Sequence, residues 1–329
     1  MNRSKNFLKR KKLFDKFSNQ LHLLKENGLI NIDLKYDKTY ICPLCVRQFN
    51  EDDLMSKNKN FLTEEDAPPN KLKGTRIALT CKECNSTAGH QIDADLIHAL
   101  RNLDDVFSLR NESQHRKIQF ESGLISGKFT PKSNGLIEVQ HSLNNNNPSL
   151  LSKYLDSLKN NSVGQKLSIT PKYGKINIES IDRALLKTSY ILTFAKFGYI
   201  FLLDKYYDLY REQIMDINSK YKKEIFVRNQ FSRDSIGTYY VINPGIKSIF
   251  NIFSLKTSYS ETLIGSIIPI PGITPEQIHK NLVSNGFSTR EKGKVKTNLN
   301  TTKYDPNADL FYDINEIKKI VQWLRKCEA

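Results

Sequence analysis

The chain of 329 residues lacks a hydrophobic run long enough to cross a bilayer. Its most apolar segment, residues 190–203, is interrupted by Lys196 and is shorter than the roughly 20 apolar residues that a membrane-spanning helix needs. The first 17 residues are basic, but they include no uninterrupted apolar segment and no small-residue cleavage motif, which argues against a signal peptide. We therefore expect a cytoplasmic protein without a membrane partner.

Acidic residues are scarce relative to basic ones. The chain has 35 Asp and Glu against 50 Lys and Arg, so its formal net charge at pH 7 is +15. A surplus of this size favours polyanionic partners, with nucleic acid first among them. The alternative is that the lysines only keep the chain in solution. The hydrophobic content of 39% is that of a globular protein, which excludes a disordered chain.

Cysteine is also rare, and its placement is informative. Four of the five cysteines form two Cys-x-x-Cys pairs, in "YICPLCVRQF" and "LTCKECNS". In a chain without a secretion signal, this pattern predicts metal binding in a reducing compartment and not disulfides. Cys42, Cys45, Cys81 and Cys84 would supply four thiolates, the closed tetrahedral coordination of structural zinc. The alternative is two unrelated reduced pairs, and Cys327 is expected to be an incidental thiol.

The N-terminal segment has the periodicity of a helix over residues 4–27, with Gly28 as its stop. Its non-apolar face is densely basic. We interpret this face either as solvated or as a surface that follows a phosphate backbone. The basic residues of this face are Lys9, Arg10, Lys11, Lys12 and Lys16.

The rest of the chain alternates between helical and strand patterns. Residues 180–215 are strongly helical, with a break at Gly198, and their aromatic stripe is expected in the core. The other predicted helices cover residues 150–161 and 313–326, and the predicted strands cover residues 116–123, 135–143, 166–170, 174–180, 237–244, 248–255 and 261–270. We therefore divide the chain into a basic helix (1–35), a cysteine-bearing unit (36–110) and an α+β domain (111–329) for target recognition or regulation.

The 35 residues between the two cysteine pairs exceed the spacing of a zinc ribbon and must form a structured insert. "FLTEEDAPP" predicts a strand that ends in acids and a double proline, "TRIALT" predicts the returning strand, and a helix is expected from Asn85. This order would bring Glu65, Asp66 and Asn85 together around a space the size of a cation. The alternatives are that Asn85 is a helix N-cap and that the acids form a solvated turn.

The insert and its cysteines resemble the HNH nucleases of the ββα-metal superfamily, in the subgroup that a four-cysteine zinc site clamps. The resemblance covers about residues 36–105. It implies that Glu65 binds a catalytic Mg²⁺ or Mn²⁺ ion, that Asn85 completes the ion's site, and that Pro68 and Pro69 match the family's proline. The expected fold is α+β: a ββα-metal HNH module, followed by a mixed helix and antiparallel-sheet domain.

Asp66 stands where the family pattern has its general-base His. An Asp is a weaker base unless burial or Glu65 raises its pKa. It could instead be a second metal ligand, with a metal-bound hydroxide as the nucleophile. A further alternative is that His90, five residues after Asn85, supplies the base, although a lone His at this place often faces solvent.

These features predict a metal-dependent endonuclease that hydrolyses DNA, with RNA left open. A restriction, antiphage or mobile-element role would fit, and the sequence does not choose among them. The alternative is a degenerate, zinc-stapled protein that binds nucleic acid without cleaving it; a third hypothesis gives the C-terminal domain a protein partner. One active site per chain would require a homodimer or two successive nicks for double-strand cutting. The residues expected to contact the nucleic acid are Lys9, Arg10, Lys11, Lys12, Lys71, Lys73 and Arg76.

Overall fold

The structure is a computed structural model that describes residues 5–55, 59–107, 113–120, 123–132, 136–160, 168–170, 176–220, 227–228, 231–271, 274–284 and 299–325. The chain divides into two compact units, and the division differs from the three consecutive segments expected from the sequence. The first unit combines the N-terminal third with most of the C-terminal half: Met1–Ile97, Asn177–Thr257 and Glu261–Ala329. The second unit consists of His98–Ile176 and Ser258–Ser260.

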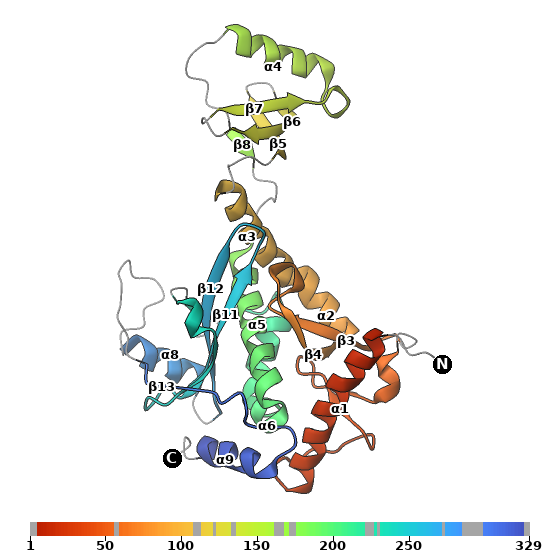
Figure 1. Cartoon of the computed structure of the whole chain (residues 1–329), viewed down its shortest axis with the longest axis vertical. Helices are drawn as coiled ribbons and strands as arrows, with labels where there is room; N and C mark the ends of the chain where they lie inside the picture. The colour runs from red at the N-terminus through yellow and green to blue at the C-terminus, as the bar shows by residue number, and fades with distance from the viewer. Residues whose placement is uncertain are drawn as a thin grey trace. The chain divides into compact units, whose positions relative to one another are not determined.

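The predicted N-terminal helix is confirmed as α1 (Lys5–Glu26), which packs beside the β3–β4 hairpin described below (Figure 1). Its apolar stripe is buried, with Phe14, Phe17 and Leu21 fully enclosed. Gly28 ends the helix with a φ of +64°, a left-handed conformation that glycine adopts without strain. The helix therefore begins and ends as the sequence pattern indicates.

The cysteine-bearing segment forms two short hairpins followed by a continuous helical stretch. Its strands are β1 (Tyr40–Ile41), β2 (Gln48–Phe49), β3 (Leu62–Ala67) and β4 (Thr75–Cys81), and its helical parts are α2 (Lys82–Ala88), the π-helical turn η3 (Gly89–Asp93) and α3 (Ala94–Phe107). The two strands predicted within the insert are confirmed as the antiparallel pair β3 and β4. The helix begins at Lys82, three residues before the predicted start, because Cys81 occupies the N-cap position.

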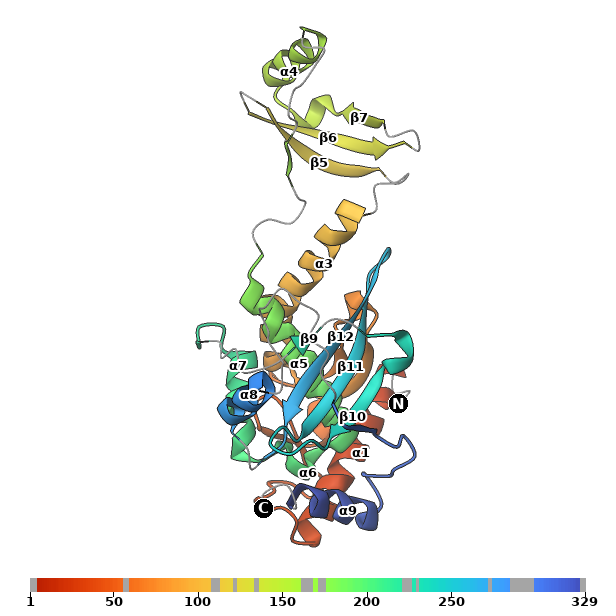
Figure 2. The same cartoon turned by 90° about the vertical axis from the view of Figure 1, so that its left-hand side faces the viewer.

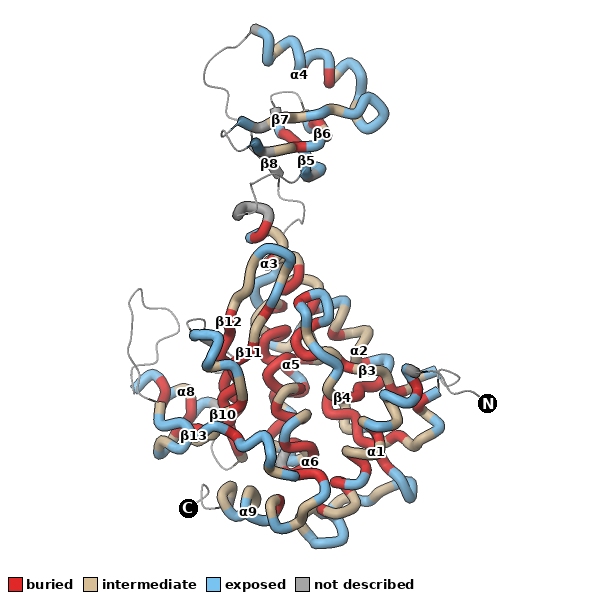
Figure 3. The backbone as a smooth tube through the Cα atoms, in the orientation of Figure 1, coloured by how far each residue is buried: buried red, intermediate tan, exposed pale blue. Residues whose placement is uncertain are grey.

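Helix α5 (Ile178–Phe197) is the centre of the first unit and packs against β3 and β4 on one side and β11 and β12 on another. Most of its length is buried (Figure 3), which confirms the prediction that its aromatic residues lie in the core. Gly198 separates it from α6 (Tyr199–Leu202), and α7 (Asp208–Met215) follows. A Cβ at Gly198 would lie 1.8 Å from Gln20 Oε1, so the predicted break requires glycine.

The predicted antiparallel strands of the C-terminal half are confirmed in a sheet with the order β13-β10-β11-β12-β9. Its strands are β9 (Val227–Arg228), β10 (Gly237–Val241), β11 (Ser248–Lys256), β12 (Glu261–Pro269) and β13 (Thr301–Lys303). Helix α8 (Pro275–Ser284) packs on one face of the sheet, and α5 packs against β11 and β12 (Figure 2). The last predicted helix is confirmed as α9 (Ile314–Arg325). No helix within the described parts of the chain is long and apolar enough to cross a membrane.

The second unit has an antiparallel sheet with the order β7-β6-β5-β8 and one covering helix. These elements are β5 (Gln114–Phe120), β6 (Gly123–Pro131), β7 (Ile137–His141), β8 (Ser168–Thr170) and α4 (Pro148–Asn160). The sequence pattern missed β6, because Gly123 and Gly127 weaken its strand signal. The strand predicted over residues 174–180 was wrong at residues 178–180, which belong to α5.

Candidate functional site

The two Cys-x-x-Cys pairs meet at one point of the first unit. The Sγ atoms of Cys42, Cys45, Cys81 and Cys84 all lie within 4.8 Å of one another. The Cys45 and Cys81 sulfurs are 3.8 Å apart, close to the edge of a tetrahedron whose metal–sulfur bonds are about 2.3 Å, the zinc value. The donor set and its spacing therefore fit a structural zinc ion. Among the described residues, no other group of three or more Cys, His, Asp or Glu side chains lies this close together.

The backbone around each pair explains why the sulfurs converge. In the first pair, the N–H of Val46 donates to the Cys42 carbonyl and the N–H of Cys42 donates to the Arg47 carbonyl, both at 2.9 Å. Val46 has a φ of +59°, a rare conformation for a β-branched residue, and one that persists where the surrounding structure imposes it. In the second pair, Cys81 ends β4 and its N–H donates to Cys42 Sγ at 3.4 Å. The hairpin and the helix are thus tied to one another through the sulfurs.

A guanidinium lies beside the cysteine cluster. Arg47 Nε donates to Cys45 Sγ at 3.3 Å, and its Nη2 donates to Glu83 Oε2 at 2.6 Å. Burial raises the pKa of the Cys42 thiol well above its usual value, so this sulfur would not ionise without a cation. A bound zinc ion with four thiolates would leave a net negative charge, which Arg47 offsets.

Strand β3 distributes its three consecutive acids over two faces. Glu65 is buried, whereas Glu64 and Asp66 are partly exposed. The register of the hairpin shifts between them: Glu65 lies opposite Ala78 and Asp66 lies opposite Arg76, so Ile77 forms a bulge. Glu64 and Asp66 therefore share a face with Arg76, and Glu65 points the other way.

Glu65 belongs to a buried ionic network that the sequence did not predict. Lys187 Nζ, from α5, lies 2.8 Å from Glu65 Oε1 and 2.6 Å from Asp93 Oδ2. The other Glu65 oxygen accepts a hydrogen bond from Thr80 at 2.8 Å. Burial alone would lower the pKa of Lys187, but the attraction of the two carboxylates outweighs it and raises that pKa. Lys187 is therefore a fixed cation between two carboxylates.

This network differs from the expected role of Glu65 as a ligand of a catalytic ion. Both of its oxygens are engaged by protein groups, and the side chain is only 2% exposed. The sequence carried one overlooked signal, because a Lys within the apolar run "ALLKTSYIL" of a buried helix needs a carboxylate partner.

The opposite face of β3 is only partly buried and less completely paired. Arg76 lies 2.7 Å from Glu64 Oε2 and 4.0 Å from Asp66 Oδ1. Glu64 Oε1 and Asp66 Oδ1 are buried oxygens without a hydrogen-bond donor. Burial raises the pKa of Asp66, while Arg76 and a hydrogen bond from Asn70 oppose the change. The direction of this shift is the one that a general base requires.

Asn85 joins the helix to this strand. Its Nδ2 donates to Thr63 Oγ1 at 2.9 Å and to the Glu64 carbonyl at 3.1 Å, so it is not the N-cap. The structure thus brings Asn85 to the strand that carries Glu64 and Asp66. His90 is exposed on η3 and forms no hydrogen bond with the described residues, in keeping with the solvent-facing alternative.

The turn after the acids is closely packed. Pro68 and Pro69 are buried, and the peptide bond between Ala67 and Pro68 is cis. A Cβ at Gly74 would lie 1.5 Å from the Pro68 carbonyl oxygen, so the return into β4 requires glycine. Lys71 and Lys73 are exposed residues of this turn, and Lys73 has a left-handed backbone.

The predicted nucleic-acid contacts fall into two groups. Lys11 pairs with Asp15 and Glu51, and Arg10 donates to the Leu62 carbonyl at 3.5 Å. Arg76 pairs with the acids of β3. The remaining four lysines are exposed and form no ion pair with the described residues: Lys9, Lys12, Lys71 and Lys73.

Comparisons with known proteins identify no relative. No protein-family model matches the chain, and neither a curated protein nor a solved structure matches it.

Proposed function

We propose that this protein is a zinc-clamped, metal-dependent endonuclease of the HNH type that hydrolyses DNA, with Asp66 and not Glu65 at its reaction centre. The observation that carries the proposal is the pair of buried carboxylate oxygens, Glu64 Oε1 and Asp66 Oδ1, that lack a hydrogen-bond donor. A buried carboxylate oxygen without a hydrogen-bond donor is costly and therefore calls for a functional explanation.

Two irregularities of the backbone in this segment support the same conclusion. A β-bulge lies opposite the Glu65–Asp66 step, and a π-helical turn interrupts the helix that follows the hairpin. Both irregularities recur beside active sites, because each redirects a side chain that a regular element would place elsewhere. Here the bulge sets Asp66 opposite Arg76, and the π-helical turn includes Asp93, the partner of Lys187.

Glu64 and Asn85 would hold a divalent ion such as Mg²⁺ or Mn²⁺, since carboxylate and amide oxygens are the ligands these ions prefer. When bound, the ion would act as a Lewis acid on a phosphate oxygen. Asp66 accepts the proton of the attacking water, and its raised pKa improves it as a base. Arg76, half-exposed and held by Glu64, offers a cation to the phosphate. Lys187 fixes the strand from the opposite face.

The proposal is tested by incubating supercoiled plasmid with the purified protein and Mg²⁺ or Mn²⁺. We expect nicking by the wild type and a loss of about 10²-fold or more in Asp66→Asn, the effect typical of a lost general base. Zinc content and DNA affinity should not change. Asp52→Asn, at an exposed carboxylate of the same unit, is the matched control and should cleave normally. A wild type that nicks with neither ion would overturn the proposal.

A second candidate function is DNA binding without hydrolysis. It is favoured by the two protein cations that already lie beside the acids: Lys187 at Glu65 and Arg76 at Glu64 and Asp66. This candidate predicts salt-dependent DNA binding by the wild type and no cleavage with either ion. In that case we expect Asp66→His, which restores the acid-His pair of the HNH pattern, to create cleavage that the wild type does not have.

A further inference from the structure

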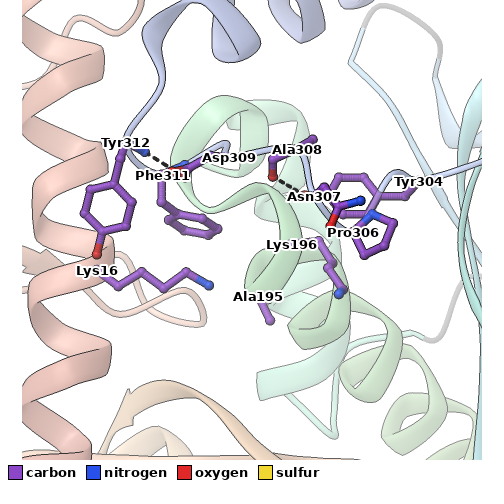
Figure 4. A pocket seen from close by; sticks show the side chains of 10 residues that line it. All are labelled: Lys16, Ala195, Lys196, Tyr304, Pro306, Asn307, Ala308, Asp309, Phe311 and Tyr312. Carbon is purple, nitrogen blue, oxygen red and sulfur yellow. Dashed lines mark hydrogen bonds between the residues drawn. The ribbon is translucent and has the colours of Figure 1, made fainter.

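A cavity of about 390 Å³ lies in the first unit, between α1, the C-terminal part of α5 and the loop that precedes α9. None of its lining residues belongs to the cysteine cluster or to the β3–β4 hairpin. Two lysines from different elements reach into it, Lys16 from α1 and Lys196 from α5 (Figure 4). The aromatic rings of Tyr304 and Phe311 supply part of its wall.

The two ammonium groups have aromatic neighbours but no carboxylate in an ion pair. Lys16 Nζ lies 3.7 Å from the ring centroid of Phe311, and Lys196 Nζ lies 5.5 Å from that of Tyr304. Among the described residues, neither lysine forms a salt bridge. Asp309 is the acid that lines the cavity, and its Oδ1 accepts the backbone N–H groups of Phe311 and Tyr312 at 3.1 Å.

The lining of the cavity therefore carries two lysines against one aspartate, an excess of positive charge. Burial, and then the repulsion of Lys196, lower the pKa of Lys16 to about 8. Asp309 opposes this change, and Lys12 on the same helix adds to it. Two like charges that face one partly desolvated space are unfavourable unless an anion joins them.

We propose that this cavity binds the phosphoryl group of a small ligand of mononucleotide size between Lys16 and Lys196. A phosphate monoester carries a charge of about −1.5 to −2 at pH 7 and three acceptor oxygens, so it has an acceptor for each of the two lysines that line the cavity. The cavity volume is within the range of small-molecule sites, about 300–1,000 Å³, and the aromatic wall suits the apolar part of such a ligand. The inference does not depend on the proposed nuclease activity.

The ionisation of Lys16 should make the affinity for phosphate depend on pH. A bound phosphate dianion stabilises the ammonium form of Lys16, so binding near pH 8 should take up a proton. Affinity should be highest where Lys16 is already charged, below pH 8, and should fall as the pH rises above that value. The titratable groups that face Lys16 from the surrounding elements are Lys12, Lys196, Asp309, Tyr304 and Tyr312.

The test is calorimetric titration of the full-length, zinc-loaded protein with inorganic phosphate and with AMP. We expect saturable binding of both at pH 7, weaker binding at pH 9, and a heat at pH 8 that depends on the ionisation enthalpy of the buffer. Lys16→Gln and Lys196→Gln should each weaken binding about tenfold or more, the loss expected for a charge-assisted hydrogen bond. Lys25→Gln, at an exposed lysine of the same helix outside the cavity, is the matched control.

Two further measurements show whether the phosphoryl group that binds belongs to a small ligand or to a nucleic acid. Adenosine, which has no phosphate, should not bind. A short DNA duplex should not displace AMP; displacement by duplex at a lower concentration than AMP itself would overturn the small-ligand inference in favour of a nucleic-acid contact.

The inference would also be overturned if the wild type bound no phosphate, or if Lys16→Gln and Lys196→Gln both bound phosphate as the wild type does. Either result would mean that the aromatic rings alone account for the placement of these lysines. Unfolding temperatures of the variants separate a loss of binding from a loss of folding.

Discussion

The two faces of β3 carry similar charges in opposite environments. On the face toward α5, Lys187 lies between Glu65 and Asp93, and its side chain is 1% exposed. On the other face, Arg76 lies against Glu64 and Asp66, and its side chain is 45% exposed. Each face thus pairs two acids with one protein cation.

The difference in burial decides what each cation can do. A buried ion pair is weakly screened, and the loss of one partner leaves a charge that the interior cannot solvate. An exposed pair is screened by water and salt and contributes little to stability. We infer that the Lys187 network is structural, and we expect that Arg76 can be replaced without unfolding the strand.

Cys81→Ser should disrupt both faces of β3 at once, because it should unfold the hairpin that carries them. Cys81 ends β4 and precedes α2, so its loss removes the link between the hairpin and the helix. Structural zinc contributes of order 10 kcal/mol or more to small units, and we expect loss of both the ion and the folded hairpin. Metal analysis of the reduced protein should give about one zinc per wild-type chain and none in the variant. Cys327→Ser is the control and should keep its zinc; a zinc-free wild type would contradict the prediction.

Lys187→Met removes the central cation of the buried ionic network. The variant leaves Glu65 and Asp93 without their cation, and breaking a buried pair in this way typically costs about 3–5 kcal/mol of unfolding free energy. Chemical denaturation measures the loss. Combining Lys187→Met with Glu65→Gln and Asp93→Asn removes the stranded charges and should restore part of the stability. A single variant as stable as the wild type would refute the structural role of this network.

The comparison of the two faces also explains which parts of the site the sequence could predict. The cysteine knuckles, the β3–β4 pair and the helix after them follow from local spacing, and the helix start was predicted to within three residues. Glu65, Asp66 and Asn85 were expected to meet around one ion because the acids end the first strand of the hairpin and Asn85 stands at the helix start. Side chains alternate along a strand, so adjacent residues point to opposite faces. Lys187, the cation that pairs with Glu65, is 122 residues away in the sequence, so no local pattern includes both residues.

The unit boundaries were difficult to predict for a related reason. The second unit is inserted between Ile97 and Asn177, so the cysteine segment packs on α5 across an interruption of the chain. Composition does not mark this insertion, and consecutive segments were the simplest division. Within the inserted unit, β6 was missed because its two glycines give no hydrophobic signal, although Gly127 lies against Val139 and Gly123 against Leu150.

The contribution of the exposed face to stability is tested by Arg76→Met. The substituted side chain differs from that of Lys187→Met chiefly in its burial. We expect a change of about 1 kcal/mol or less in unfolding free energy, because exposed pairs are screened. DNA affinity, or cleavage if the wild type cleaves, should fall more noticeably than stability does. Parallel denaturation of the two Met variants in the same buffer is the measurement. Equal destabilisation by both would remove the distinction between the two faces.

The smallest expected effect is a change in the salt dependence of DNA binding. It concerns lysines that form no ion pair with an acid among the described residues. If Lys71 and Lys73 neutralise DNA phosphates, Lys71→Gln with Lys73→Gln should reduce the slope of log affinity against log salt by about 0.9 for each phosphate that is no longer neutralised. Lys11→Gln, at a lysine already paired with Asp15 and Glu51, should leave the slope nearly unchanged. Fluorescence anisotropy of a labelled duplex over a range of salt concentrations measures both slopes.

Because Lys71 and Lys73 are exposed and form no ion pair with the described residues, their substitution should leave the unfolding temperature constant. A change in slope then reports on the interface with DNA and not on the fold. An unaltered slope in the double variant would place the DNA contact away from the β3–β4 turn. Lys9 and Lys12 of α1 would then be the next pair to substitute, since they share the same exposure and the same lack of an acidic partner among the described residues.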